Sequence, residues 1–261
     1  AEFKKVWVWI ETNEGKIRSV GPELLGRARD LADKLEEDVV AVIIGHGIEK
    51  HAEKLIHHGA DKVLVVDNEI FKDYTTDAYT IAMNTLIAPR KPAVVLYGAT
   101  SNGRDLAPRV AARMGIGLTA DCTGLDIDEE RQLVQTRPAF GGNIMAEILS
   151  PYTRPQMATG RPNVFKPIEP DTSREGEIEK VDIEINPVQV RTKILEKVRQ
   201  VAEGMKSVEE ADVVVCSGRG IKDPANLELP KKLADLLHAA VGGSRPIVDL
   251  GWPPPTQQVG Q

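Results

Sequence analysis

The sequence predicts an α/β protein with two domains. Its first 115 residues alternate between short β-branched strands and amphipathic helices, a pattern typical of a parallel sheet. A similar pattern of strand, glycine-containing turn and helix starts again at Ala211 and has completed only one unit when the sequence reaches Gln261. A length of 261 residues is also near the size at which a single hydrophobic core stops growing. We therefore expect a parallel-sheet α/β domain with additional strands, followed by an incomplete doubly wound one.

Val- and Ile-rich runs and helical spacing define the elements of the first domain. Runs without polar alternation are typical of strands buried on both faces, and helices are predicted where apolar residues recur every three or four positions. Right-handed crossovers between parallel strands are nearly obligatory. The predicted strands are 6–10, 39–44, 62–66 and 93–97, and the predicted helices are 22–37, 49–58, 76–88 and 104–114.

The alternation of strands and helices ends after Gly117, and we expect further strands there. These strands complete the first domain, which is predicted over residues 1–186. A hairpin is predicted because Asp-Glu-Glu-Arg separates two strand-like segments. Residues 187–206 are predicted to form a long amphipathic helix that links the domains, with apolar residues at helical spacing from Val190 to Ala202. The additional strands are 121–126, 132–136, 143–149, 156–164 and 181–185.

The second domain is predicted over residues 207–261. Residues 213–216 are expected to form a strand, 217–220 a turn, 230–240 a helix and 246–249 a second strand. Two parallel strands with one crossover helix cannot cover both faces of a sheet, and small sheets need three or more strands for independent stability. The domain is therefore predicted to be incomplete.

Composition argues against several classes of function. The chain carries a net charge of -6 with acids and bases interspersed, so it has no basic stripe for nucleic acid. Its longest apolar runs fall far short of the ~20 residues that a bilayer crossing needs, so membrane insertion is not expected. The first residues lack the apolar segment of a signal peptide. We therefore expect a cytoplasmic protein.

The cysteines and histidines predict neither a catalytic nor a metal site. The two cysteines make no CxxC spacing. Four histidines that are close in sequence lack carboxylate partners at ligand spacing, which favours solvated side chains over metal ligands. The acidic turn at 126–130 lacks the alternating ligands and the glycine of a calcium loop. The cysteines and histidines concerned are Cys122, Cys216, His46, His51, His57 and His58.

Two glycine-containing regions could bind a ligand, because free backbone N–H groups at a helix N-terminus attract phosphates. Residues 97–105 match neither GxGxxG nor a phosphate-binding loop, so a ligand site and a capped turn both remain open there. The second region combines Ser217-Gly-Arg-Gly220 with Val241-Gly-Gly-Ser-Arg245. Its two arginines could hold a pyrophosphate by charge-assisted hydrogen bonds, and one could lie over a planar ring. Two solvated surface turns are the alternative.

Several motifs in fixed order resemble the alpha subunits of electron-transfer flavoproteins. In the second domain these are Ser217-Gly-Arg-Gly220, Gly242-Gly-Ser-Arg245 with Asp249, and Gln258-Val-Gly-Gln261. The resemblance continues upstream over nearly the whole chain, and several ordered motifs are far more specific than any single one. The upstream motifs lie within residues 98–109, 117–123, 136–147 and 154–159.

The resemblance implies a Rossmann-like FAD domain and a heterodimer with a beta subunit. It implies no acid–base or nucleophilic catalyst, and a first domain that forms the subunit interface without a nucleotide of its own. Arg245 would lie against the isoalloxazine, where a fixed cation would favour reduced and anionic flavin and raise its potential. Dehydrogenases, acting on acyl-CoA or other substrates, and quinone-, ferredoxin- or NADH-linked proteins would be the redox partners. The implied FAD contacts are Arg219, Ser244, Arg245, Gln258, Val259, Gly260 and Gln261.

Two alternatives stay open. Residues 118–166 are similar to the electron-bifurcating branch of the family, in which the beta subunit carries a second FAD and meets NADH. The chain could instead be a scaffold module without a working FAD site. Family members continue past the Gln-Val-Gly-Gln turn with segments for the adenosine part of FAD, so we expect this chain to be a truncated, cleaved or partial form of the subunit.

Overall fold

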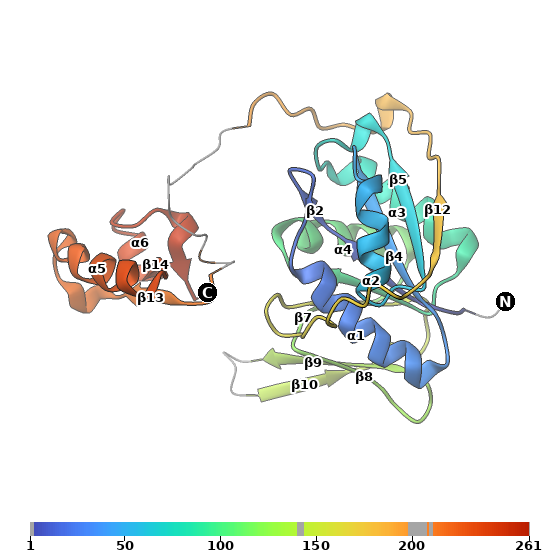
Figure 1. Cartoon of the computed structure of the whole chain (residues 1–261), viewed down its shortest axis with the longest axis horizontal. Coiled ribbons are helices and arrows are strands. Elements are labelled where there is room, and N and C mark those ends of the chain that lie inside the picture. Colours follow the sequence, from blue (N-terminus) through green and yellow to red (C-terminus); the bar gives the residue numbers. More distant parts are fainter. Residues whose placement is uncertain (1–2, 140–143, 198–207, 209–210, 261) are drawn as a thin grey trace. The chain divides into compact units, whose positions relative to one another are not determined.

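The computed structural model describes residues 3–139, 144–197, 208 and 211–260. It divides into two compact units, Ala1–Lys193 and Ile194–Gln261, and both contain parallel strands and helices (Figure 1). The division falls within the segment that the sequence predicts to be a linking helix. The α/β class predicted from the alternating pattern is confirmed.

A seven-stranded sheet forms the centre of the first unit. Its strand order is β12-β5-β4-β1-β6-β11-β7, and every neighbouring pair is parallel. The four strands predicted from Val and Ile runs are all present. The strands are β1 (Val6–Ile10), β4 (Val39–Gly45), β5 (Lys62–Asp67), β6 (Val94–Gly98), β7 (Leu118–Cys122), β11 (Gln156–Gly160) and β12 (Glu177–Lys180).

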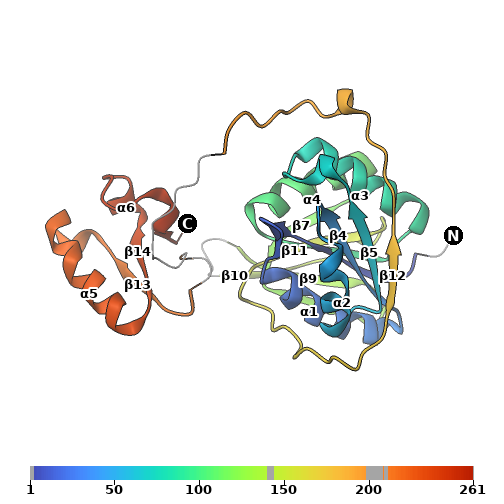
Figure 2. The same ribbon diagram turned by 45° about the horizontal axis from the view of Figure 1, so that its top comes forward.

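Helices cover both faces of this sheet, as continuous apolar strands require. Helices α1 (Val20–Leu35) and α2 (Ala52–His57) lie on one face, and α3 (Thr76–Arg90) and α4 (Ser101–Met114) lie on the other (Figure 2). Side chains of β1 alternate between the two cores: Val8 packs with the α1 side, whereas Trp7 and Trp9 pack with the α3 side. The tryptophans are therefore core residues. A small hairpin of β2 (Thr12–Asn13) and β3 (Lys16–Ile17) follows β1.

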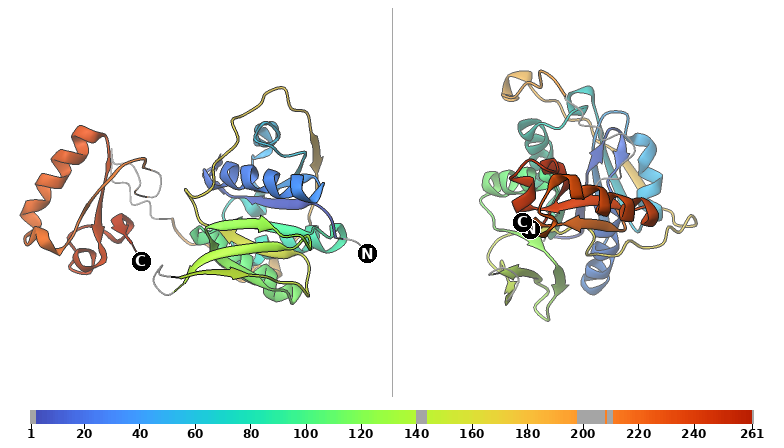
Figure 3. Two further views of the ribbon diagram at one scale, coloured as in Figure 1. Left: turned by 90° about the horizontal axis from the view of Figure 1, so that it is seen from below. Right: turned by 90° about the vertical axis from the view of Figure 1, so that its left-hand side faces the viewer.

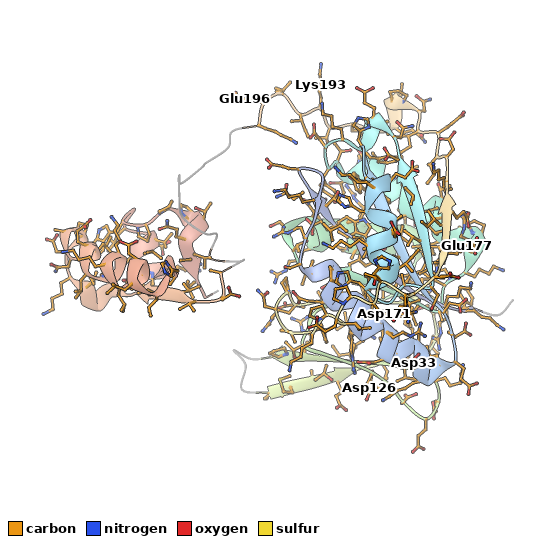
Figure 4. All side chains as sticks on the ribbon, in the orientation of Figure 1. Asp33, Asp126, Asp171, Glu177, Lys193 and Glu196 are labelled. Carbon is orange, nitrogen blue, oxygen red and sulfur yellow. The ribbon has the colours of Figure 1, made fainter. Side chains whose placement is uncertain are left out.

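A separate antiparallel sheet, in the order β10-β9-β8, lies against α1 (Figure 3). Its strands are β8 (Gly124–Ile127), β9 (Leu133–Ala139) and β10 (Ile144–Ile148), and β8 and β9 form the predicted hairpin. Lys34 of α1 approaches Asp126 of β8, with Nζ 2.5 Å from Oδ1 (Figure 4 labels Asp126). The single strand predicted at 121–126 is wrong, because β7 ends at Cys122 and β8 begins at Gly124 in a different sheet. Asp121, where φ is 62°, lies at the register shift between β7 and β11.

Three further predictions in the first unit need correction. The strand predicted at 156–164 ends at Gly160, and no strand forms at 181–185. The edge strand is β12 instead, because residues 177–180 pair with β5. Of the predicted linking helix 187–206, the structure has one 3-10 turn at Pro187–Gln189 and no helix over 190–197, while most of the remainder lies outside the described residues.

A tether to α3 explains why the start of the linker is not helical. Arg191 donates from its backbone N, Nε and Nη2 to the carboxylate of Asp77, over 3.1, 3.0 and 2.8 Å. Val190 packs against the core on the α3 side, whereas Leu195 is 89% exposed, so the described part of the apolar pattern does not bury one continuous helical face. Most helical stability in proteins comes from packing of the apolar face, so the pattern alone does not hold a helix.

The second unit contains three parallel strands in the order β13-β14-β15. The strand predicted at 246–249 is wrong: the second strand is β14, and residues 245–248 form a helical turn. Ser244 is extended, and Pro246 stands in the first turn, where its fixed φ suits a helix start. The elements are β13 (Val214–Ser217), α5 (Glu228–Leu237), β14 (Ala240–Ser244), α6 (Arg245–Val248) and β15 (Gln258–Val259), with 3-10 turns at Arg219–Ile221, Pro224–Leu227 and Pro255–Gln257.

Candidate functional site

The topology of the first sheet points to the carboxyl ends of β1 and β6, because the strand order reverses between them. Ligands of α/β proteins commonly bind in the crevice at such a switch point. Here the chain's own Glu11, 2% exposed, occupies that position. Its carboxylate accepts from Thr100 Oγ1 at 2.5 Å and from Asn102 Nδ2 at 2.9 Å. An internal anion thus sits where a ligand anion would.

The turn before α4 is a capped helix start, which confirms one of the two interpretations of residues 97–105. Thr100 Oγ1 accepts from Gly103 N at 3.0 Å and caps the helix. The positive end of α4 is also close to the Glu11 carboxylate, which Thr100 and Asn102 hold. The sequence signal for this arrangement is a lone acidic residue directly after a buried strand.

The carboxyl edge of the second sheet has a different character. Register places Ser217, Gly243 and Gln258 level with one another, and Ser244 level with Val259. Strand by strand, the next residues are Gly218 and Arg219 after β13, Arg245 after β14 and Gly260 after β15. The structure therefore brings the predicted residues of all three segments to one edge. Gln261, also predicted, lies outside the described residues.

Two exposed cations mark this edge. Arg219 has no ion-pair partner among the residues that the structure describes, and Arg245, 71% exposed, has a single one, with Nε 3.5 Å from Asp249 Oδ2. Ser244, the residue before α6, makes no capping hydrogen bond with its side chain. The edge thus offers two guanidinium groups and a hydroxyl, a donor set suited to phosphate oxygens and to a planar ring.

Two glycines at this edge serve different purposes: one allows two strands to pack closely, and the other leaves the backbone open. A Cβ at Gly242 would lie 2.5 Å from Val259 Cγ2, so glycine is needed where β14 packs against the segment of β15. A Cβ at Gly220 would meet nothing within 4 Å, so the backbone after Arg219 is open to an approaching ligand. A glycine-lined edge with two arginines fits a dinucleotide.

Two of the other chemistry-bearing residues, His51 and Cys122, have structural surroundings. His51 Nε2 lies 2.7 Å from Gly15 O, and burial raises the pKa of the Cys122 thiol to about 12. Cys216 is exposed. Across the described part of the chain, no cluster of three or more His, Cys, Asp or Glu side chains could hold a metal ion. No helix described there is both long and apolar enough to cross a membrane.

Family models match both units. The electron transfer flavoprotein domain matches residues 6–186, and the electron transfer flavoprotein FAD-binding domain matches residues 207–261. The chain belongs to the electron transfer flavoprotein alpha subunit family. The second match covers the glycine-lined edge, so the second unit of this family member is an FAD-binding domain. The resemblance predicted from the ordered motifs is confirmed.

Curated relatives agree with this assignment. The chain is 50% identical over 260 residues to an electron transfer flavoprotein subunit alpha of Thermoanaerobacterium thermosaccharolyticum, covering 100% of this chain and 78% of that protein. It is 46% identical over 264 residues to the subunit of the same name from Megasphaera elsdenii, with the same coverage. A subunit of a lactate dehydrogenase (NAD(+),ferredoxin) from Acetobacterium woodii is 38% identical over 99% of this chain and 61% of its own length.

One residue of the edge was missed as a partner by sequence reasoning. Asp249 stands four residues after Arg245, the spacing at which two side chains meet on a helix. The spacing of four residues is visible in the sequence. The prediction of a strand at 246–249 hid its meaning, because side chains four residues apart meet on a helix and not on a strand.

Proposed function

We propose that this chain carries FAD in a two-subunit electron transfer flavoprotein and passes electrons between dehydrogenases and an acceptor. The observation that carries the proposal is the convergence of Arg219, Ser244 and Arg245 on the carboxyl edge of the unit that matches the FAD-binding domain. The corresponding edge of the first unit is taken by Glu11, which favours the second unit as the FAD site.

The residues at this edge would bind and orient the cofactor. We propose that Arg219, Ser244 and the segment from Gln258 to Gln261, with Val259 and Gly260, contact FAD, and that Arg245 lies against its isoalloxazine ring. FAD supplies the capacity to accept and release one or two electrons. The protein contributes charge: a guanidinium close to the ring favours the electron-rich forms by Coulomb attraction, which strengthens as water is excluded.

The first unit offers a surface for a beta subunit. Strand β10 is at the edge of the antiparallel sheet, and its Ile144 and Met145 are each 54% exposed. Leu149, directly after it, is 49% exposed. Exposed edge strands with apolar side chains are unusual in free proteins and support an interface here. We propose a cytoplasmic heterodimer that works with acyl-CoA or other dehydrogenases and with quinone-, ferredoxin- or NADH-linked partners.

The test is coexpression of the chain with its beta subunit, followed by flavin spectroscopy. The wild-type complex should show a flavin spectrum that bleaches on reduction. Arg245→Gln should lower the reduction potential of the bound flavin and weaken FAD binding, since a cation is lost near the ring. A stable complex that never contains flavin would overturn the proposal and indicate a scaffold module.

An electron-bifurcating complex is the second candidate. It is favoured by the 38% identical relative from Acetobacterium woodii, whose name joins NAD(+) with ferredoxin in one reaction. In that case the beta subunit would hold a second FAD. The flavin content decides between them: two FAD per heterodimer support bifurcation, and one FAD contradicts it.

A further inference from the structure

The guanidinium of Arg245 shares a single turn of helix with an anion. Arg245 Nε is 3.5 Å from Asp249 Oδ2. The backbone fixes this spacing, because Asp249 N donates to Arg245 O at 2.8 Å. Ile247, fully buried, and Val248, 9% exposed, anchor the turn beneath them. Trp252 N donates to Ile247 O at 3.1 Å, and this bond ties the residues after Asp249 back to the turn. The fold therefore fixes the backbone of the two residues one turn apart, and their side chains lie at ion-pair distance.

Stability of α6 does not explain this carboxylate. A negative charge at a helix C-terminus opposes the helix dipole. The ion pair is 71% and 65% exposed, and pairs so exposed contribute little to stability. Arg219, the other cation of the edge, lacks an ion-pair partner in the described part of the chain. The anion thus accompanies only one of the two arginines.

We propose that Asp249 is a positioning residue for Arg245 and limits the positive charge that the bound flavin experiences. The inference rests on the proposed function, since it needs FAD at this edge. Because the contact uses Nε, both Nη groups of Arg245 keep their hydrogens for a ligand. The carboxylate also offsets part of the field of the cation, so the flavin gains electrons less readily than beside an unpaired arginine.

The variant that tests this is Asp249→Asn, which keeps the size of the side chain and removes its charge. We expect the bound flavin to become easier to reduce, with the preference for reduced over oxidised FAD rising roughly three- to tenfold, where tenfold equals about 30 mV for a two-electron couple. Asp249→Glu keeps the negative charge, so this variant should have the same flavin potential as the wild type.

A matched control is available in the same unit. Asp235 is exposed on α5, close to its end at Leu237. Because a crossover helix runs antiparallel to its strands, that end lies at the opposite edge of the sheet from Arg245. Asp235→Asn makes the same change in net charge and should leave the flavin potential unaltered.

The measurement is a spectroelectrochemical titration of the flavin in the complex with the beta subunit, together with the FAD dissociation constant of each variant. A rise in potential in Asp249→Asn alone supports the inference. If Asp249→Asn matches wild type while Arg245→Gln lowers the potential, the role given to Asp249 is wrong and the FAD site stands. If the wild-type complex binds no FAD, the proposed function fails, and this inference fails with it.

Discussion

A methyl group added at Gly242 should push β15 away from β14 at the edge where we propose that FAD binds. The added Cβ would lie 2.5 Å from Val259 Cγ2, and Cβ contacts under 3.0 Å are essentially never seen, so Val259 must shift. Val259 belongs to a strand of only two residues, whose pairing with Gly243 and Ser244 would be strained. Overpacking of this kind costs about 1–3 kcal/mol. We place Gly242→Ala at about 1–2 kcal/mol, because Val259 is only half-buried and can shift.

The assay is a titration of the flavin-depleted complex with FAD. A thermal melt, followed by the rise in flavin fluorescence, gives the temperature at which FAD is released. Gly242→Ala should weaken FAD binding about tenfold, the equivalent of 1.4 kcal/mol, and lower the release temperature. Gly220→Ala is the control, because its Cβ meets no protein atom within 4 Å. It should leave protein stability unchanged and weaken FAD binding only through contact with the ligand. Wild-type affinity in Gly242→Ala would refute the assignment of β15 to the site.

Two further predictions concern the first unit. The pKa of Asp77 is lowered to about 2 from 3.8, chiefly by the hydrogen bond from Arg191, so this pair stabilises the fold fully above pH 3.8 and loses its effect as the pH falls towards 2. The difference in melting temperature between wild type and Arg191→Gln should shrink over that range, and a difference that grows on acidification would contradict the tether. Glu11→Ala leaves Thr100 and Asn102 without their acceptor and should cost about 1–3 kcal/mol in urea unfolding without changing FAD affinity. A loss of FAD affinity at full stability would instead place the nucleotide in the first unit.

Local signals were sufficient wherever the chain is buried on both faces. The run from Val39 to Ile44 and its neighbours could be predicted as strands because a covered parallel sheet selects uninterrupted β-branched residues. The motifs with arginines beside glycines, after β13 and β14, could also be found from the sequence, and the structure brings them to the edge where we propose that FAD binds. Neither prediction requires knowledge of which strands become neighbours.

The elements that could not be predicted depend on tertiary contacts. Residues 190–197 have a helical apolar pattern but form no helix, because Asp77 binds Arg191 and Leu195 stays 89% exposed. Gly242, which precedes the strand predicted at 246–249, lies within β14, where it pairs with Cys216 of β13. The position of Glu11 directly after a buried strand is a local signal, but its partners Thr100 and Asn102 are 89 and 91 residues away and could not be predicted from it. Each of these depends on a neighbour that is distant in sequence.

The central claim is that FAD binds at the carboxyl edge of the second unit and not at the corresponding edge of the first. Hydrogen–deuterium exchange of the complex with and without FAD tests it directly, because backbone amides that meet a ligand exchange more slowly. The account predicts FAD-dependent protection at Gly218–Ile221 and Gly242–Arg245, with exchange at Gly98–Asn102 unchanged. Protection confined to Gly98–Asn102 would contradict it.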